Sequence, residues 1–456
     1  MPLNMNLARP EIRLLLYAAA AVLVLVVLAL VGRIPLKYNL RNLTVRWRTT
    51  LMTALAFTMV IGLLTVMLAF VNGMAKLIAS SGQPGNLLIL AQGVTDETFS
   101  SLAYGDTDDI KNQRGILLEN GQPVVSRETY LVVNQPLAKP VPGRPKRRFL
   151  QLRGVEDAPL AGRAHGMQLY DGGRWISDAG ASPVASADGG APETLYDVVI
   201  GEGIAQQLWF DRPEDERDAT REPQRLTVGD RVQLGECQGI VVGVMQSAGS
   251  TFDSELWVKN TVVRENFGKN AYTSMVLRTD GPEKAAELKR FFNEDYRKAS
   301  LQALTETEYY SGLSQTSQQF LYASIFLAVI ISIGGIFGVM NTMFAAISQR
   351  TKDIGVLRII GFSRWQILLS FLLESIFIGL IGGLLGLALG MACDGWTATS
   401  IVSSGGGGGK SVVLRLTVDG QILAVGLLLT LAMGFIGGLI PALMSAVRLK
   451  PLEALR

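Results

Sequence analysis

The chain has 456 residues, of which 48% are hydrophobic and 18% are charged, and its formal net charge is +3. This composition is too apolar for an ordinary soluble protein and too charged for a protein that lies wholly within a bilayer. The small net charge gives no indication of nucleic-acid binding. We therefore expect a chain that is divided between a membrane and water.

Long apolar runs are the first feature met along the chain, and a helix needs about 20 such residues to cross a bilayer. The runs are Leu14 to Val31, Leu51 to Val71, Phe320 to Ile347, Ile367 to Cys393 and Ile422 to Val447. The last four predict membrane-spanning helices. The first is shorter and follows Arg9 and Arg13, so a signal peptide competes with a further span. Because no small-residue cleavage site follows this run, we expect it to be retained.

The cations between these runs predict the orientation of the chain. Lys and Arg gather in residues 33–48, 350–364 and 448–456. Segments rich in Lys and Arg stay on the cytoplasmic side of a membrane. We therefore expect these three segments inside the cell, residues 75–319 outside the membrane, and a multi-pass protein of the cell inner membrane.

The large outside segment predicts a mixed fold. Short runs of aliphatic and β-branched residues, such as NLLIL at 86–90 and GIVVGVM at 239–245, are bounded by turn-forming residues and predict strands. Helix-like pieces at Ile204 to Phe210 and Glu283 to Asn293 lie between such runs, so we expect an α+β domain. The segment from Glu294 to Gln319 has few helix breakers and predicts a continuous stalk helix that leads into the third apolar run.

A short charged helix is predicted between the third and fourth runs, and its surroundings carry a resemblance. The string GVMNTMFAAISQRTKDIGVLRIIGFS, Gly338 to Ser363, resembles the permease subunits of the MacB/FtsX/LolC family of ABC systems. In that family an Arg-Thr-x-Glu-Ile-Gly-x-x-Arg-like string forms a coupling helix that sits in a cleft of a separate ATPase. The matching positions here are Arg350, Thr351, Lys352, Asp353, Ile354, Gly355, Val356, Leu357, Arg358 and Gly361.

This chain departs from the family pattern at two points of that string. Asp353 replaces the usual Glu, and Gly361-Phe362 replaces Gly-Ala. Two further strings, VVIGEGIAQQLWF with LTVGDRVQLGECQGIVVGVMQ and the C-terminal RLKPLEALR, are similar to the periplasmic core and to the ending of the same family. The resemblance thus covers most of the chain.

The resemblance implies an architecture. We expect an α-helical membrane bundle of four core transmembrane helices plus one extra N-terminal apolar helix, with a large extracytoplasmic α+β domain. The expected divisions are residues 1–33 for the extra segment, 34–75 for a cytoplasmic elbow and the first core helix, 76–319 for a MacB-like core domain with its stalk, and 320–456 for the FtsX-like permease domain with the coupling helix.

The resemblance also implies a function without catalysis in this chain. ATP and Mg would bind to a separate ABC ATPase subunit, whose cycle would move the extracytoplasmic domain and drive export of a substrate from the periplasm or the outer membrane leaflet. The permease would be a homodimer or a heterodimer with a related permease, embedded in membrane lipid, with a periplasmic adaptor or a hydrolase as a further partner. The alternatives are an FtsX-like regulator of a cell-wall hydrolase, LolC/LolE-like release of lipoproteins, and a membrane-anchored sensor without an ATPase.

Two features imitate catalytic or binding sites. The tract SGGGGGKS, Ser404 to Ser411, resembles a phosphate-binding P-loop, but it lacks the first Gly and no helix-forming segment follows it. We interpret it as a flexible linker. His165 is the only histidine, which excludes a multi-His metal site, and we interpret it as an ordinary surface or loop residue. We expect no catalytic, cofactor-binding or metal-binding residue.

Polar residues and glycines within the apolar runs predict helix packing. Glu374 and Asn341 lie within predicted spans, where an ionisable or polar side chain is costly. We expect Glu374 to make a structural contact inside the bundle, with Asn341 as a partner across helices. A stripe of small residues on the fourth run predicts a packing face: Gly379, Gly382, Gly383, Gly386 and Gly390.

Overall fold

The structure is a computed structural model that describes residues 41, 45, 47–136, 146–184, 192–213, 217, 220–247, 249–312, 314–403 and 409–448. The chain divides into two compact units. The helical unit comprises Met1–Asn72, Phe320–Trp396 and Leu416–Arg456, and the sheet unit comprises Gly73–Gln319 and Thr397–Arg415. The first apolar run, Leu14 to Val31, lies outside the described residues, so the extra N-terminal helix stays a prediction.

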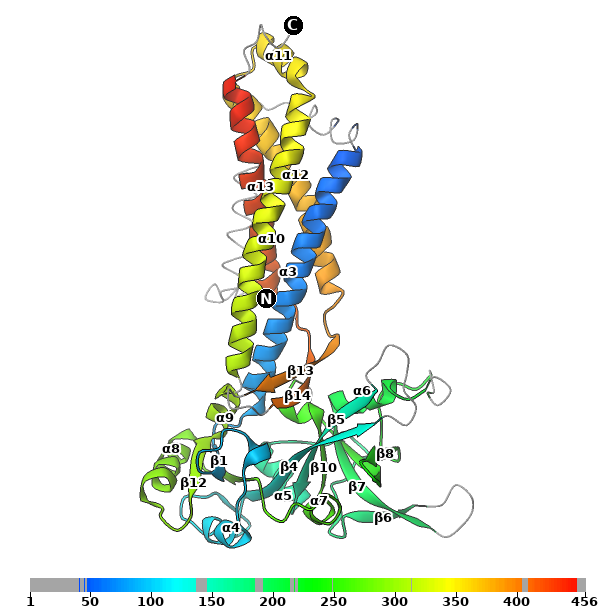
Figure 1. Ribbon diagram of the computed structural model, residues 1–456, viewed down its shortest axis with the longest axis vertical. Coiled ribbons are helices and arrows are strands. Elements are labelled where there is room, and N and C mark those ends of the chain that lie inside the picture. The colour runs from blue at the N-terminus through cyan, green and yellow to red at the C-terminus, as the bar shows by residue number, and fades with distance from the viewer. Residues whose placement is uncertain are drawn as a thin grey trace, which may run out of the picture. The chain divides into compact units, whose positions relative to one another are not determined.

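Four long helices in the described part of the chain are apolar enough to cross a membrane, which confirms the four predicted core spans (Figure 1). They are α3 (Trp47–Ser81), α10 (Ser314–Ser348), α12 (Arg364–Met391) and α13 (Gly420–Arg448). Helices α3 and α10 each have 35 residues. At 1.5 Å per residue each is about 52 Å long, whereas the hydrocarbon core of a bilayer is about 30 Å thick. Both helices are therefore longer than a span requires.

The predicted glycine stripe of α12 is a packing face. A Cβ atom added at Gly382 would collide with the carbonyl of Ala54 on α3, and one added at Gly383 would collide with Thr430 on α13. The hydroxyl of Thr58 donates a hydrogen bond to the carbonyl of Gly382 at 3.0 Å. Small residues let helix backbones approach in this way within membranes. The stripe thus holds α12 against two neighbouring helices.

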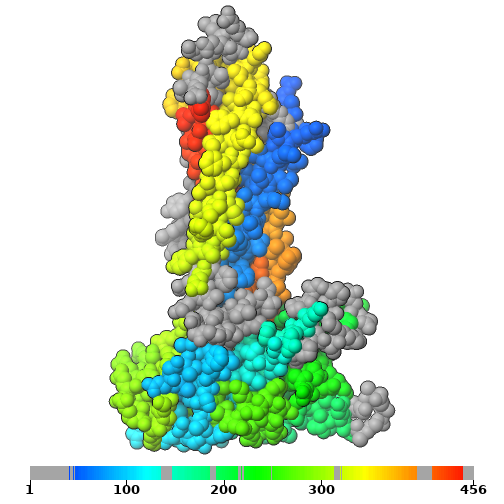
Figure 2. Space-filling view, in the orientation of Figure 1, coloured from blue at the N-terminus to red at the C-terminus, as the bar shows by residue number. Residues whose placement is uncertain are grey.

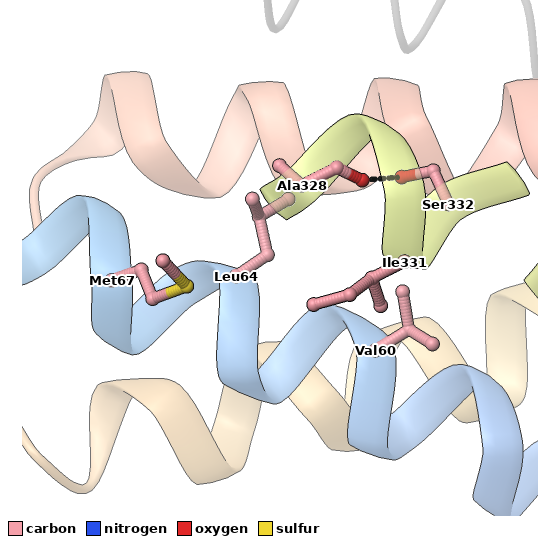
Figure 3. A pocket seen from close by; sticks show the side chains of 6 residues that line it. All are labelled: Val60, Leu64, Met67, Ala328, Ile331 and Ser332. Carbon is pink, nitrogen blue, oxygen red and sulfur yellow. Dashed lines mark hydrogen bonds between the residues drawn. The ribbon is translucent and has the colours of Figure 1, made fainter. Parts of the chain in front are cut away.

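Helices α3 and α10 lie side by side on the surface of the bundle (Figure 2). A narrow crevice between them is lined by side chains from both helices (Figure 3): Val60, Leu64, Met67, Ala328, Ile331 and Ser332. The crevice has no room for a water molecule. The hydroxyl of Ser332 donates to the carbonyl of Ala328 at 2.6 Å, within its own helix. This crevice offers a polar substrate neither space nor a partner.

The sheet unit is built on one mixed ten-stranded sheet, which confirms the predicted α+β class. Its strand order is β12-β1-β11-β4-β5-β10-β7-β9-β8, with β6 paired to β7. Strands β5 and β10, and strands β7 and β9, are parallel pairs. The strands of this sheet are β1 (Asn86–Ala91), β4 (Val125–Pro136), β5 (Arg147–Val155), β6 (Ala181–Val184), β7 (Glu193–Gly201), β8 (Arg231–Leu234), β9 (Cys237–Met245), β10 (Glu255–Lys259), β11 (Ser274–Arg278) and β12 (Leu301–Thr305).

Helices and two hairpins complete this unit. The helices are η1 (Glu97–Phe99), α4 (Tyr104–Ile110), α5 (Ala158–His165), α6 (Glu202–Phe210), η3 (Thr251–Ser254), α7 (Asn260–Phe267), α8 (Pro282–Arg290), η4 (Phe291–Asp295) and α9 (Glu306–Gly312). The hairpins are β2 (Leu118–Glu119) with β3 (Gln122–Pro123), and β13 (Thr397–Ser403) with β14 (Gly409–Arg415).

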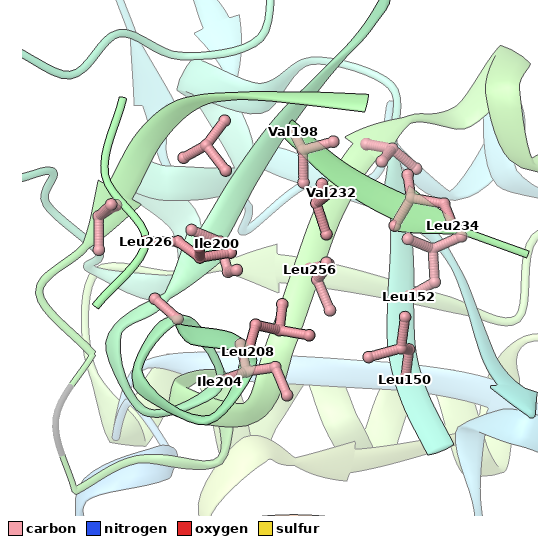
Figure 4. Packing of buried hydrophobic residues seen from close by; sticks show 14 of the residues in the cluster. Leu150, Leu152, Val198, Ile200, Ile204, Leu208, Leu226, Val232, Leu234 and Leu256 are labelled. Carbon is pink, nitrogen blue, oxygen red and sulfur yellow. The ribbon is translucent and has the colours of Figure 1, made fainter. Parts of the chain in front are cut away.

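Two separate apolar cores stabilise the sheet unit. One core joins β5, β7, β9 and β10 to α6 and α7, and Figure 4 shows Leu152, Ile200 and Leu256 within it. The other joins β1, β11 and β12 to α4 and α8. Alternate residues of most strands supply these cores, as the two-residue period of a strand requires. Strand β9 is the exception, because it contributes Val241 and Val244 on either side of a register shift against β7.

Two sequence-based expectations were wrong here. The segment from Glu294 to Gln319 is not one helix, because Leu301–Thr305 forms strand β12 beside β1 and helical structure resumes at Glu306. Leu301 and Ala303 enter the second apolar core, so tertiary pairing overrides helix propensity there. Gly409–Ser411 was expected in a flexible linker but belongs to β14, which pairs with β13. Residues 404–408 lie outside the described residues.

The opposite face of the central strands carries buried charges. Glu128 on β4, Arg153 on β5 and Glu255 on β10 are each fully buried. Arg153 makes a bidentate pair with Glu255 at 2.6 and 2.7 Å and also pairs with Glu128. His165 at the end of α5 is 2% exposed, so its assignment as a surface residue was wrong. The sheet unit thus contains a charged core beside its apolar ones.

His165 is a charged imidazolium in this core. Its Nε2 lies 2.7 Å from Glu128 and its Nδ1 lies 3.0 Å from Glu306. Carboxylates accept hydrogen bonds, so this geometry suits an imidazole that carries a proton on each ring nitrogen. Burial by itself would lower the pKa of His165, but the charge of Glu128 and the hydrogen bonds with both carboxylates outweigh it and raise the pKa to about 10.

We predict that alkaline pH weakens the sheet unit through His165. The pKa rises from 6.5 in the unfolded chain to about 10 in the fold. The stabilisation from this group is therefore complete below about pH 6.5 and is lost as the pH rises through about 10. The midpoint of thermal unfolding should fall by about 5 °C or more over this window in the native chain. The matched His165→Gln variant should lack this component, and equal pH dependence of both chains would contradict the prediction.

Candidate functional site

The predicted coupling segment forms the short helix α11, Thr351–Ile359, between α10 and α12 (Figure 1). A two-residue turn separates it from the end of α10 at Ser348, and the hydroxyl of Thr351 donates to the carbonyl of Ser348 at 2.8 Å. Arg350 is the N-cap residue, and its carbonyl accepts the first helical hydrogen bond from Ile354 at 3.0 Å. This short, hydrogen-bonded turn restricts the movement of α11 relative to α10.

A buried ion pair fastens the start of α11 to α12. Arg350 donates from Nη1 and Nη2 to the two carboxylate oxygens of Glu374, at 2.7 and 2.8 Å. Both side chains are 3% exposed, and the guanidinium lies 5.9 Å from the ring centre of Phe371. The partner of Glu374 is therefore Arg350 and not Asn341, whose side chain is exposed on α10. The expected structural contact of Glu374 exists, with a different residue.

The end of α11 is fixed by its backbone. The N–H of Gly361 donates to the carbonyl of Arg358 at 3.3 Å, and the N–H of Phe362 donates to that of Leu357 at 3.1 Å. This pair of bonds is a Schellman motif, and it requires a left-handed residue that is usually glycine. Gly361 supplies it with φ of 110°. The sequence motif therefore includes Gly361 for a conformational reason.

A capping box then starts α12. The hydroxyl of Ser363 accepts from the N–H of Gln366, and the side chain of Gln366 accepts from the N–H of Ser363 at 2.8 Å. Two orphan donors are satisfied in this reciprocal arrangement. Helix α11 thus has a defined position relative to the helices before and after it.

Helix α11 has an inner face and an outer face. Ile354 and Gly355 are buried, and Ile354 packs into the apolar core of the bundle. Thr351, Leu357 and Arg358 are half-buried, whereas Lys352, Asp353 and Val356 are exposed. Because Gly355 lies on the inner face, a bulky residue there would disturb the bundle and not the approach of a partner. Only the outer residues of the motif are available for contact.

An exposed apolar patch continues from this outer face. We call it the α11 patch, and it comprises Val356 at 45% exposure, Ile359 at 61%, Ile360 at 69% and Trp365 at 70%. The sequence motif includes Val356 but not the other three residues. The signal was present, because two isoleucines and a tryptophan among cations are unusual in a solvated loop. Exposed apolar patches with polar surroundings mark interaction sites.

Comparisons with known proteins identify the family of this chain. Residues 50–291, more than half of the chain, match the family described as MacB-like periplasmic core domain. Residues 325–447 match the family described as FtsX-like permease C-terminal. The chain belongs to the MacB/FtsX-type ABC permeases. Helix α11 and Glu374 lie inside the FtsX-like match.

Curated relatives of this MacB/FtsX-type permease include three that differ in origin. An uncharacterised ABC transporter permease of Methanocaldococcus jannaschii is 26% identical over 62% of this chain and 64% of the relative. The uncharacterised ABC transporter permease YknZ of Bacillus subtilis is 29% identical over 47% and 53%. The macrolide export ATP-binding/permease protein MacB of Bdellovibrio bacteriovorus is 27% identical over 67% and 48%. The chain thus spans about half to two thirds of the length of these relatives.

Two solved structures also align with part of this permease. The periplasmic region of MacB from Actinobacillus actinomycetemcomitans is 14% identical, with a TM-score of 0.33, over 53% of this chain and 95% of that structure. The extracellular domain of YknZ is 15% identical, with a TM-score of 0.31, over 48% of this chain and 99% of that structure.

Within the described residues of this chain, no group of three His, Cys, Asp or Glu side chains is placed to hold a metal ion.

We predict that Glu374→Gln destabilises this permease strongly. The substitution leaves the buried guanidinium of Arg350 without a counter-charge, which costs about 3–5 kcal/mol of unfolding free energy. Thermal unfolding in detergent measures the loss. The exposed carboxylate of α11 provides the control, and Asp353→Asn should cost less than about 1 kcal/mol.

A double replacement separates charge from shape. Arg350→Met with Glu374→Met removes both charges and keeps similar volume, so most of the stability should return. If Glu374→Gln alone unfolds no earlier than the native chain, the ion pair does not secure α11.

Proposed function

We propose that this chain is the permease subunit of an inner-membrane ABC system in which a separate ATPase docks on the α11 patch. The observation that supports the proposal is the combination of exposed apolar residues with a rigid mounting. Ile359 and Ile360 are exposed on the surface of the chain, while Arg350 and Gly361 fix the two ends of the helix. A partner that contacts α11 would therefore move α12 with it.

The proposed mechanism is mechanical. The partner holds ATP and Mg²⁺, and its ATP-driven closure would displace α11 through the patch. The Arg350–Glu374 pair would pass that displacement to α12, and the two-residue turn after Ser348 would pass it to α10. Helix α10 continues to Ser314, in the sheet unit. Movement of that unit would then act on a substrate outside the cytoplasm.

The names of the relatives favour export as the function of this system. Several relatives are named macrolide export ATP-binding/permease proteins. In such an arrangement two permease chains would work together, either two copies or two related chains. The packed glycine face of α12 and the closed crevice between α3 and α10 suit a mechanical role better than a channel within one chain. Regulation of a hydrolase or release of a lipoprotein would use the same docking site with a different external partner.

We predict that Ile359→Asp with Ile360→Asp abolishes recruitment of the ATPase. Each substitution places a charge where docking would exclude water, at a cost of about 2–5 kcal/mol when unpaired. Recruitment should fall about 100-fold or more when the permease is used to capture its ATPase, and the stimulated rate of ATP hydrolysis should fall with it.

The control places a charge at an equally exposed apolar residue of the sheet unit. Phe99 is 62% exposed, and Phe99→Asp should leave recruitment unchanged. If the α11 double variant recruits the ATPase normally, the patch is not its docking site. Loss of membrane insertion in that variant would instead assign the patch to the lipid interface.

A further inference from the structure

The two chain segments that lead from the sheet unit into α3 and α10 meet at one carboxylate. Glu306 is the first residue of α9 and precedes α10 by eight positions. Its Oε2 accepts the backbone N–H of Gln83, two residues after the end of α3, at 2.9 Å. The same oxygen accepts from Nδ2 of Asn86, the first residue of β1, at 2.7 Å. A Cβ added at Gly82 would lie 3.0 Å from the backbone of Thr307, so the segments touch directly.

His165 connects this meeting point to the middle of the sheet. Its Nδ1 faces Oε1 of Glu306 at 3.0 Å, and its Nε2 faces Oε1 of Glu128 on β4 at 2.7 Å. Glu128 pairs with Arg153 on β5, which pairs with Glu255 on β10. A continuous row of charged hydrogen bonds thus runs from the two segments across three neighbouring strands.

The surroundings make this row stiff. Its members are at most 2% exposed, and the rings of Phe252 and Trp257 lie 4.6 and 5.8 Å from the ring of His165. Charged hydrogen bonds are stronger where water is excluded, and breaking one there leaves an unpaired buried charge. The neighbouring pair of Lys289 with Glu308 on α9 is 29% and 49% exposed. Solvent screens that second pair, so it constrains α9 far less.

We propose that His165 is a positioning residue that locks the segments after α3 and before α10 to the sheet. We call the Glu306–His165–Glu128 bridge the charged joint. The contacts of the charged joint all lie within this chain and do not depend on a partner. Its role in passing movement to the sheet rests on the proposed mechanical function. With the joint intact, the two segments and the central strands move as one body.

Hydrogen exchange of the full chain in detergent tests the joint without any ATPase. His165→Gln and Lys289→Gln each remove one positive charge opposite a glutamate of α9, at a buried and an exposed position respectively. Amides of residues 82–91 and 301–312 should exchange about tenfold faster or more in His165→Gln. They should change less than about twofold in Lys289→Gln. Amides of β7 and β9 should keep their native rates in Lys289→Gln, and in His165→Gln they should accelerate clearly less than the amides of the two segments, because only the general loss of stability reaches them.

Three outcomes would overturn the proposal. Native exchange rates of residues 82–91 and 301–312 in His165→Gln would show that the bridge does not hold these segments in place. Equal acceleration in β7 and β9 would show that His165 supports the whole fold and not these two segments. Equal effects of His165→Gln and Lys289→Gln would show that burial of the bridge is irrelevant.

A second variant keeps the test decisive if His165→Gln folds poorly. Glu306→Gln preserves shape and removes the charge at the other end of the bridge. If the two residues act as a pair, the double variant should accelerate exchange by clearly less than the product of the single effects. A full product would mean that the residues act independently, which contradicts the joint.

The mechanical role is tested separately with the ATPase present. His165→Gln should then hydrolyse ATP at the native rate and lose external function. If the native chain recruits no ATPase, the proposed function fails while the exchange result still decides the joint. If His165→Gln retains full external function despite faster exchange, the joint positions the segments but does not transmit movement, which overturns its proposed role.

Discussion

The pairing of Arg350 with Glu374 is the interaction on which the arrangement of the helical unit around α11 depends. A short helix of nine residues between two spans has too few internal hydrogen bonds to hold its own position. The bidentate geometry and the burial of both partners provide that position. The Schellman motif at Gly361 provides the second fixed point. Between these two points, the residues of the α11 patch are presented in one orientation.

Buried ion pairs precede and follow α10 along the chain. Glu306 of the charged joint precedes it, and Arg350 follows it after two residues. Along its length α10 is sparsely covered, with 17% of its apolar stretch buried compared with 67% for α12. Within a single chain, most of the side of α10 is therefore left uncovered. Helix α12, by contrast, is packed closely against its neighbours through its glycines.

The spans and α11 could be predicted from the sequence because their signals are local. Apolar runs of sufficient length predict the four long helices, and the family string predicts α11. The partner of Glu374 could not be predicted, because Arg350 lies 24 positions away and joins it only when α10 and α12 are packed. Within the predicted segment, the direction of each side chain was also unknown. The sequence therefore could not show that Gly355, a residue of the motif, faces the inside of the bundle.

The charged core of the sheet unit shows a second limit of sequence reasoning. Alternation in β5, where Leu150 and Leu152 alternate with Gln151 and Arg153, predicts two different faces. It does not predict that a further layer covers the polar face. Helices α5 and α9 supply that layer by long-range contacts and bury His165 with Glu306. A lone histidine in a sequence carries no mark of such a position. Strand β12 was missed for a similar reason, since its pairing with β1 joins residues over 200 positions apart.

The central claim is that α11 is the surface through which a partner ATPase moves this permease. Photo-cross-linking from a reactive amino acid at position 359 tests it most directly, with position 391 at the far end of α12 as the matched control. Ile359 and Met391 are both exposed, at 61% and 45%. The account predicts a covalent adduct with the ATPase from position 359 and none from position 391. Adducts with lipid alone from position 359, or ATPase adducts from position 391 alone, would contradict it.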